Sequence, residues 1–273
     1  MKMKRLTAVT LAAALVFCAA SVQAASINPT LDDRFQIRLG PFYANMDSTI
    51  TLSSGQEVDL EEQFDDDALT GAIYLNWRVT PRINLEFGYS QLLRDESVTL
   101  DQSVPLGDLA TLPAGSKFTG EFNTRVYRFG AAYSVFRNEK SEFGISLGVS
   151  ALNLEDILAF TPAGGPKITL YESDVTEPMG SIGISGTYAF SPQWLVNGRV
   201  GYLGVSLGDI DGKMWDVFGG VEFRPWKNIG LGLAYAYNDA DITVQKDSGD
   251  TDVNWTYQGP FAYLTIGFGT VAK

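Results

Sequence analysis

Hydrophobicity alternates with a period of two residues along most of the chain. In residues 229–237, large apolar side chains occupy every second position, and glycine or alanine occupies the positions between them. Segments 83–90, 127–135 and 143–150 alternate in the same way, with small or polar residues between the large ones. A period of two is typical of β-strands, because successive side chains point to opposite faces of a sheet. The sequence therefore predicts an all-β protein.

The side chains on one face of the predicted strands are large and those on the other are small, and this difference indicates whether the sheet is surrounded by water or by lipid. A water-soluble sandwich would bury the large residues and leave an outer surface of mainly Gly, Ser and Ala, whereas a barrel in lipid is apolar outside and small or polar inside. After residue 24 no run approaches the roughly 20 apolar residues of a membrane helix, and open sheet edges are not tolerated in hydrocarbon. We therefore expect a closed antiparallel transmembrane β-barrel. Aromatic residues that would form an interfacial girdle gather at predicted strand ends: Trp77, Phe136, Tyr188, Phe190, Trp194, Phe223 and Trp226.

The turns predict the number of strands. Very short turns occur at 80–82, 138–140, 191–193 and 225–228. The alternate connections are longer and mostly acidic, at 53–67, 102–114, 161–167, 208–213 and 246–252. Short periplasmic turns and longer outer loops are the outer-membrane arrangement, and four such turns with both termini periplasmic give ten strands. They are expected near 34–52, 68–79, 82–100, 116–137, 141–160, 168–190, 193–207, 213–224, 229–245 and 253–269. Eight or twelve strands remain alternatives, because 53–67 could pair within itself as a hairpin.

The first 24 residues have the pattern of a secretory signal peptide. Three basic residues precede an apolar stretch at 6–17, and a small-x-small cleavage pattern ends at Ala24. A lipoprotein acylated at Cys18 is the alternative, but that site needs a small residue before the cysteine, and Phe17 stands there. Cleavage after Ala24 would leave residues 25–273 as a single barrel domain without cysteine.

Charge and the absence of histidine restrict the function. The chain has 20 basic and 32 acidic residues, a net charge of -12, and loss of the signal peptide makes the remainder more acidic. Such a chain repels nucleic acid, so we expect no nucleic-acid partner. Because the chain contains no histidine, it lacks the usual proton carrier of catalysis near neutral pH. We therefore expect no catalytic residues and no enzyme activity, and a lipid-modifying enzyme is the weakest alternative.

Seven charged residues fall on the face expected to line the lumen: Arg38, Arg78, Glu86, Arg128, Arg199, Glu222 and Arg224. One interpretation is a set of ion pairs that brace the interior, since an unpaired charge in a dry lumen is costly. The other is a gate or selectivity site in a narrow pore, where arginine would favour anions. Ten strands with many small inward residues leave more room than eight, so the sequence leaves both interpretations open.

Acidic residues gather in the first predicted outer loop. Seven carboxylates lie within residues 57–67, without a basic residue. Such a loop is either simply solvated or a site for a divalent cation, because Ca²⁺ and Mg²⁺ take carboxylate oxygens. The candidate ligands are Glu57, Asp59, Asp65, Asp66 and Asp67. No other cofactor is expected.

The end of the chain resembles a known group of proteins. Residues 223–232 and 257–268 are similar to the closing strands of small Gram-negative outer-membrane barrels of the OmpA/OmpW type. The resemblance implies an outer-membrane location with extracellular acidic loops and periplasmic termini. Its implied partners are outer-membrane lipid, lipopolysaccharide and the barrel assembly machinery. In that group the machinery reads a terminal phenylalanine, for which Phe268 is the candidate, although five residues follow it.

These observations predict a non-enzymatic integral barrel with a structural or surface-contact role in the cell envelope. The alternative is a small pore or conduit for small apolar or anionic solutes. Conductance across a lipid bilayer distinguishes the two.

Overall fold

The computed structural model describes residues 26–51, 57–59, 67–106, 110–162, 164–207, 210–244 and 251–271. The predicted signal peptide and Cys18 lie outside the described residues. Among those described, no helix is long and apolar enough to cross a membrane.

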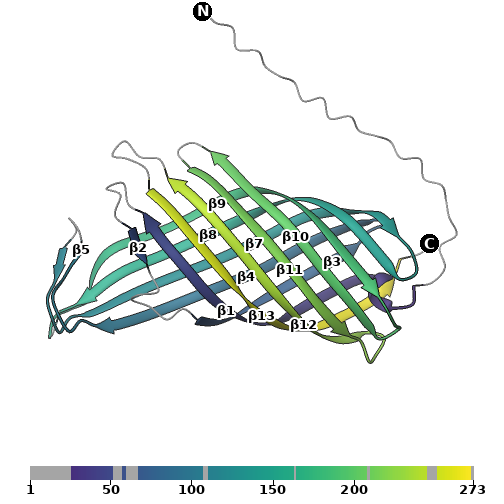
Figure 1. Cartoon of the computed structure of the whole chain (residues 1–273), viewed down its shortest axis with the longest axis horizontal. Helices are drawn as coiled ribbons and strands as arrows, with labels where there is room; N and C mark the ends of the chain where they lie inside the picture. Colours follow the sequence, from purple (N-terminus) through teal and green to yellow (C-terminus); the bar gives the residue numbers. More distant parts are fainter. Residues whose placement is uncertain are drawn as a thin grey trace, which may run out of the picture.

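Ten long antiparallel strands form a closed barrel (Figure 1). They are β1 (Asp33–Thr51), β3 (Asp67–Arg78), β4 (Ile83–Thr99), β7 (Lys117–Arg137), β8 (Ser141–Thr161), β9 (Ile168–Ala189), β10 (Trp194–Leu207), β11 (Ile210–Phe223), β12 (Ile229–Val244) and β13 (Thr251–Thr270). Each strand pairs with the barrel strands next to it in the chain, and β13 pairs with β1 to close the wall. The predicted fold class and the count of ten are confirmed, which excludes eight or twelve.

Some expected loops contain strand structure. β2 (Glu57–Asp59) pairs with Thr49–Thr51 at the end of β1, so the described part of the connection 53–67 extends β1 into a hairpin instead of pairing within itself. β5 (Val104–Leu106) and β6 (Ala110–Leu112) pair with each other within the connection 102–114.

The expected loop 208–213 is also mostly strand. The ladder between β11 and β12 continues as far as Ile210 opposite Val244, so the backbone groups of 210–213 pair instead of looping out. The two ends of the barrel therefore differ clearly. We call the end with short connections at 79–82, 138–140, 190–193 and 224–228 the turn end, and the opposite end the loop end.

Large apolar side chains cover the outside of the barrel, as the alternation predicted. Leu147 is 68 % exposed and Leu233 is 62 % exposed, whereas the inward-facing Ser150 and Ala234 are buried. A monomeric water-soluble protein rarely exposes a continuous apolar surface of this kind. The surface instead suits the hydrocarbon of a membrane.

Aromatic residues bound this apolar band at the turn end. Trp77, Phe136, Tyr188, Phe190, Trp194 and Trp226 are exposed there, and Phe223 is half-buried with its ring 4.6 Å from that of Trp194. On β7 the exposed apolar positions begin at Tyr127 and end at Phe136. That stretch matches the roughly 9–11 residues with which a tilted strand crosses a membrane.

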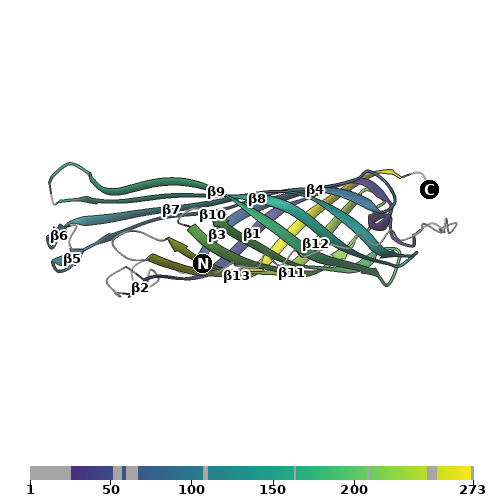
Figure 2. The same ribbon diagram turned by 90° about the horizontal axis from the view of Figure 1, so that it is seen from above.

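Four strands continue well beyond the apolar band at the loop end (Figures 1 and 2). β7, β8 and β9 contain 21, 21 and 22 residues, about twice the length needed to cross. Pairing between β9 and β10 ends at Gly180, whereas β9 remains paired with β8 as far as Ile168. We call this extension the projecting wall. It comprises residues 92–99, 117–126, 150–161 and 168–179.

Candidate functional site

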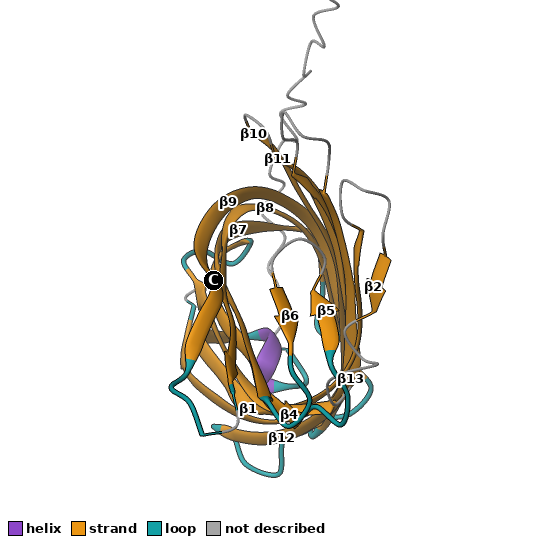
Figure 3. Cartoon of the chain, turned by 90° about the vertical axis from the view of Figure 1, so that its left-hand side faces the viewer, coloured by secondary structure: helices purple, strands orange, loops and turns teal. Residues whose placement is uncertain are grey.

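An N-terminal segment lies inside the turn end of the barrel. Its short 3-10 helix η1 (Pro29–Leu31) appears within the barrel outline in Figure 3. Leu31 is 1 % exposed and packs against Ala189 and Leu195 of the inner wall. The sequence analysis did not anticipate this segment, although Asn28 followed by Pro29 is a recognisable helix start, since asparagine is a favoured N-cap residue and proline is favoured in the first turn. We call residues 26–32 the plug.

Arginine side chains from the wall hold the plug. Arg224 donates hydrogen bonds to Thr30 Oγ1 at 2.8 Å and to Asp33 Oδ2, at the start of β1, at 2.6 Å. Arg137 forms an ion pair with Asp32 at 2.8 Å and donates to the Leu31 carbonyl. The Arg224 side chain is fully buried, so its charge depends on these partners for compensation.

Further contacts connect the plug to other strands and turns. The Asn28 side chain donates to the Pro192 carbonyl at 3.2 Å, and the Ile27 amide donates to the Glu139 carbonyl at 2.9 Å. Thr30 Oγ1 lies 3.2 Å from Glu222 Oε1. The plug is thus bonded to three of the four short turns or their flanking strands.

An apolar layer crosses the lumen on the loop side. It consists of inward side chains from six strands, each at most 8 % exposed: Val126, Leu152, Met179, Leu203, Met214 and Tyr257. On β7 this layer lies two residues nearer the loop end than Arg128, and on β11 two residues nearer than Asp216. The layer therefore narrows the barrel directly beyond the charged residues of the lumen.

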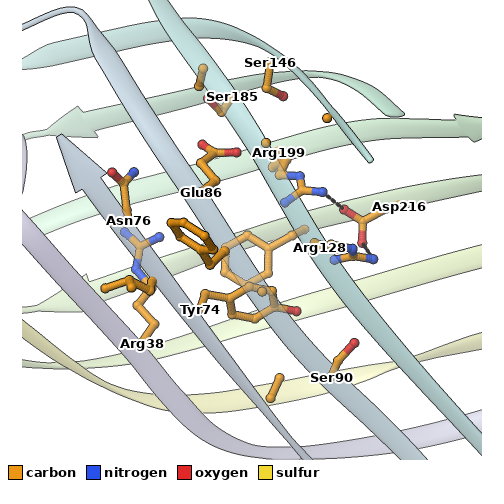
Figure 4. Close-up of a pocket in the computed structure, with 18 of the residues that line it drawn as sticks. Arg38, Tyr74, Asn76, Glu86, Ser90, Arg128, Ser146, Ser185, Arg199 and Asp216 are labelled. Carbon is orange, nitrogen blue, oxygen red and sulfur yellow. Dashed lines mark hydrogen bonds and ion pairs between the residues drawn. The ribbon is translucent and has the colours of Figure 1, made fainter. Parts of the chain in front are cut away.

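The lumen contains a cavity of about 240 Å³. It is lined by Leu31 of the plug at one end, and at the other by Val126 of the apolar layer and by Thr124, which lies two residues nearer the loop end on β7. One wall carries small inward residues from β7, β8 and β9, including Gly130, Ser146, Gly148 and Ser185. The opposite wall, formed by β1, β3 and β4, carries long polar side chains: Gln36, Arg38, Asn76, Asn84 and Glu86. Small residues facing long ones leave the open space that Figure 4 shows.

Two arginines share one carboxylate at the edge of this cavity. Arg128 lies 3.0 Å from one oxygen of Asp216, and Arg199 lies 3.1 Å from the other (Figure 4). The side chains of Arg128 and Asp216 are about one-tenth exposed, and that of Arg199 is 28 % exposed. The group carries two positive charges and one negative charge, so it presents a net positive charge to the cavity.

Glu86 stands apart from this cluster. It lines the cavity from β4, opposite Asn76 on β3 and Gly130 on β7. Within the part of the chain that the structure describes, its carboxylate makes no ion pair and no hydrogen bond. Since Gly130 offers no side chain, the neighbouring strand supplies no counter-charge at this position.

The other predicted lumen residues lie nearer the turn end. Arg38 Nε is 3.5 Å from Glu222 Oε2, and Arg78 forms a 2.7 Å ion pair with Glu142. Arg224 meets Asp33, as described above. The structure thus brings six of the seven predicted residues into ion pairs and leaves Glu86 out. Their roles as braces or as a gate stay predictions.

The sequence analysis missed three of the acidic partners. Asp216 and Glu142 follow the same alternation as the small inward residues of β11 and β8, so the pattern contained them. Asp33 was missed because it falls on the same alternate positions as the outward Leu39 and Tyr43, so the alternation would place it on the lipid face, whereas the structure buries it. Arg137 was hidden for a different reason: a register shift between Ser134 and Phe136 interrupts the alternation of β7 and turns Arg137 inward.

The predicted cation ligands and the assembly residue remain open. Glu57 and Asp59 lie on β2 and Asp67 begins β3, while Asp65 and Asp66 lie outside the described residues. In the described ranges no group of three or more His, Cys, Asp or Glu residues is arranged to hold a metal ion. Phe268 is 44 % exposed and stacks on Phe35 across the seam that closes the barrel, with ring centroids 5.3 Å apart.

Comparison with known proteins gives a likeness in structure but none in sequence. No protein-family model matches the chain, and no curated protein matches its sequence. The outer-membrane protease OmpT of Escherichia coli superposes with a TM-score of 0.53 at 12 % identity, covering 86 % of this chain and 96 % of that one. The chain has the fold of an outer-membrane β-barrel.

Two further solved structures match more loosely. The P. putida toluene transporter TodX matches with a TM-score of 0.41 at 10 % identity, covering 90 % of this chain and 93 % of that one. Ail, the attachment invasion locus protein of Yersinia pestis, matches with a TM-score of 0.30 at 11 % identity, covering 84 % of this chain and 99 % of that one. The narrower resemblance to the OmpA/OmpW type stays a prediction.

Proposed function

We propose that the protein is an integral barrel of a Gram-negative outer membrane, with a closed lumen and a non-enzymatic structural or surface-contact role in the envelope. The observations that carry the proposal are the plug at the turn end and the apolar layer that narrows the lumen on the loop side of the charged residues. A barrel narrowed at two levels is suited to bracing and to presenting its loop end, and less suited to passive flow.

The ion pairs support the bracing role. They connect strands that are distant in the chain: Arg128 and Asp216 are 88 residues apart, and Arg78 and Glu142 are 64 apart. A buried ion pair is weak evidence for stability by itself, because desolvation offsets the attraction. It does fix which side chains face each other across the lumen, and this keeps the cross-section filled.

The projecting wall supports the surface-contact role. It stands beyond the apolar band, and its surface carries polar pairs alongside exposed apolar residues such as Leu93 and Ile168. Arg125 forms a 2.7 Å ion pair with Glu155, and Asn153 donates to Asp174 at 2.8 Å. We place this end outside the cell, against lipopolysaccharide, with the turn end and both termini in the periplasm. Insertion by the barrel assembly machinery, with Phe268 as the recognition residue, belongs to the same proposal.

The composition favours a non-enzymatic role. The whole chain contains no histidine. The buried Ser134 lies beside a carboxylate and donates a hydrogen bond to it, but that carboxylate, Glu142, is paired with Arg78. A carboxylate held by a guanidinium is a poor general base, because the positive charge stabilises its ionised form.

Cell fractionation and gel mobility test the placement. The mature chain should sediment with the outer membrane and migrate faster on gels before boiling than after, because a closed barrel resists detergent. Recovery in the soluble periplasm without a heat shift would refute it. For the surface role, a variant with the projecting wall shortened at all four strands should retain the heat shift and lose contact with neighbouring cells or surfaces. If contact is unchanged, the surface-contact role is refuted and the bracing role is the one that remains.

A conduit for small solutes is the second candidate, and the cavity is the observation that favours it. The cavity carries charged side chains, including Glu86, Arg128 and Arg199, among apolar ones, and a barrel built only for rigidity does not need it. If the plug moves aside, the cavity becomes part of a path through the lumen. Swelling of proteoliposomes in small anions, altered by Arg128→Ala or Arg199→Ala, would favour this second function over bracing.

A further inference from the structure

We propose that the lumen cavity is a binding site for a small zwitterionic solute, whose cationic group contacts Glu86 and whose anionic group contacts Arg199. The site goes beyond the envelope role and does not depend on conduction. A ligand of this class would be held inside the barrel.

The charges of the cavity are unbalanced in two places. On the β10–β11 side, Arg199 and Arg128 share the single carboxylate of Asp216, which leaves one positive charge in excess. On the β4 side, the Glu86 carboxylate has no cationic partner among the described residues. Figure 4 shows Glu86 pointing into the open space, with Arg199 beside it in the view. The two excess charges cancel in sum, and no ion pair joins Glu86 to Arg128 or Arg199 in the described structure, which is the pattern that a zwitterion complements.

Buried polar atoms around the cavity also lack partners. Gln36 Nε2 and Asn84 Oδ1 make no hydrogen bond within the described structure, and their residues are 7 % and 5 % exposed. Both residues line the cavity. Almost all buried polar atoms in native proteins are hydrogen-bonded, so these two point to a polar occupant. Water can satisfy them, and a solute with donors and acceptors can do so as well.

The size of the cavity restricts the solute. A volume of about 240 Å³ lies below the roughly 300–1,000 Å³ of pockets for drug-sized ligands. Tyr74 and Phe261 also line the cavity, so a short aliphatic spacer between the charged groups would have an apolar surface to pack against. A free amino acid or a compound of similar size fits this description.

Binding of matched probes to the purified full barrel tests the proposal. Titration calorimetry in detergent would compare a zwitterion series (glycine, β-alanine and γ-aminobutyrate) with butyrate, butylammonium and butanol. At least one zwitterion should bind about tenfold tighter than every other probe, since a charged hydrogen bond contributes about 1.5–3 kcal/mol and 1.4 kcal/mol corresponds to a factor of ten. Glu86→Gln should weaken binding of that zwitterion about tenfold and leave butyrate unchanged, whereas Arg199→Gln should weaken both.

Two controls keep the outcome decisive. Glu155→Gln, which removes a carboxylate from the outer face of the projecting wall, should leave binding unchanged. Ser185→Leu, which fills the cavity while retaining both charged residues, should abolish binding and preserve the heat shift of a folded barrel. If no zwitterion binds more tightly than the singly charged probes, or if Ser185→Leu binds as the wild type does, the cavity holds water only and the proposal is wrong. Failure here leaves the envelope role untouched, because that role rests on closure and placement.

Discussion

Replacing Arg224 with methionine should release the plug. The Arg224 side chain is fully buried, and its guanidinium bonds Asp33, Thr30 and the Lys227 carbonyl at 2.6, 2.8 and 2.7 Å. Methionine retains most of the apolar stem but removes the charge, so the buried Asp33 carboxyl would lose its main partner. Removing one member of a buried pair costs roughly 3–5 kcal/mol.

Several interactions would remain. The plug would keep the Arg137–Asp32 ion pair and the bonds from Asn28 to Pro192 and from Ile27 to Glu139. The bond that Arg224 makes to the plug itself is the one to Thr30, because Asp33 belongs to β1. A hydrogen bond to a charged group contributes about 1.5–3 kcal/mol, and about 1.4 kcal/mol corresponds to a factor of ten in an equilibrium, so the ratio of closed to open plug should fall by roughly tenfold or more. The barrel wall should survive, since its ladders do not involve the guanidinium.

Thiol labelling measures this opening directly. The only cysteine of the chain lies at position 18, within the predicted signal peptide, so Leu31→Cys would place a single thiol in the mature plug. Leu31 is 1 % exposed, and the thiol should react slowly with a maleimide in the otherwise wild-type barrel and much faster with Arg224→Met. The control is Arg34→Met, which removes an exposed arginine nearby. Equal labelling rates with and without Arg224 would refute the account of how the plug is held.

Two further predictions concern the membrane and the loops. Leu147→Arg, on the apolar band, should cost roughly 2–4 kcal/mol in unfolding titrations if the position lies near the midplane, whereas Ser146→Thr, on the inward face, should cost much less. Similar costs would mean that the register is shifted by one residue. Millimolar calcium or magnesium should protect loop 53–67 from protease where sodium at equal ionic strength does not, because divalent ions bridge carboxylates. Replacing Asp65, Asp66 and Asp67 with asparagine should abolish that protection. If the loop is digested equally in every condition, its carboxylates are simply solvated and bind no divalent ion.

The barrel itself could be predicted from the sequence for a physical reason. A strand in lipid places apolar side chains outward at alternate positions, so the period of two persists over whole strands and marks their ends within a few residues, even though some inward residues such as Leu203 and Tyr257 are also large. β8, expected at 141–160, is observed at 141–161. The closed sheet then follows from the need to pair every backbone group in hydrocarbon.

The contacts inside the lumen could not be predicted in the same way. Alternation states which side chains face inward but not which of them meet across the lumen, because that depends on how far the strands are staggered around the barrel. Arg128 and Asp216 illustrate this, since they come from β7 and β11. The plug lacks alternation altogether and is held by contacts distant in the chain, such as Asn28 with Pro192. A local register shift in β7 turns the Arg137 side chain inward, opposite to what the alternation predicts.

Planar-bilayer recording of the purified mature barrel tests the closed lumen most directly. The plug and the apolar layer predict a membrane that stays silent at moderate voltage after insertion, with insertion verified by the heat-shifted band. Removal of the plug alone should give at most small, brief steps, because the layer around Leu203 and Met214 would still narrow the lumen. Reproducible long-lived open steps in the wild-type protein, sensitive to Arg199→Ala, would contradict closure and make the barrel a pore.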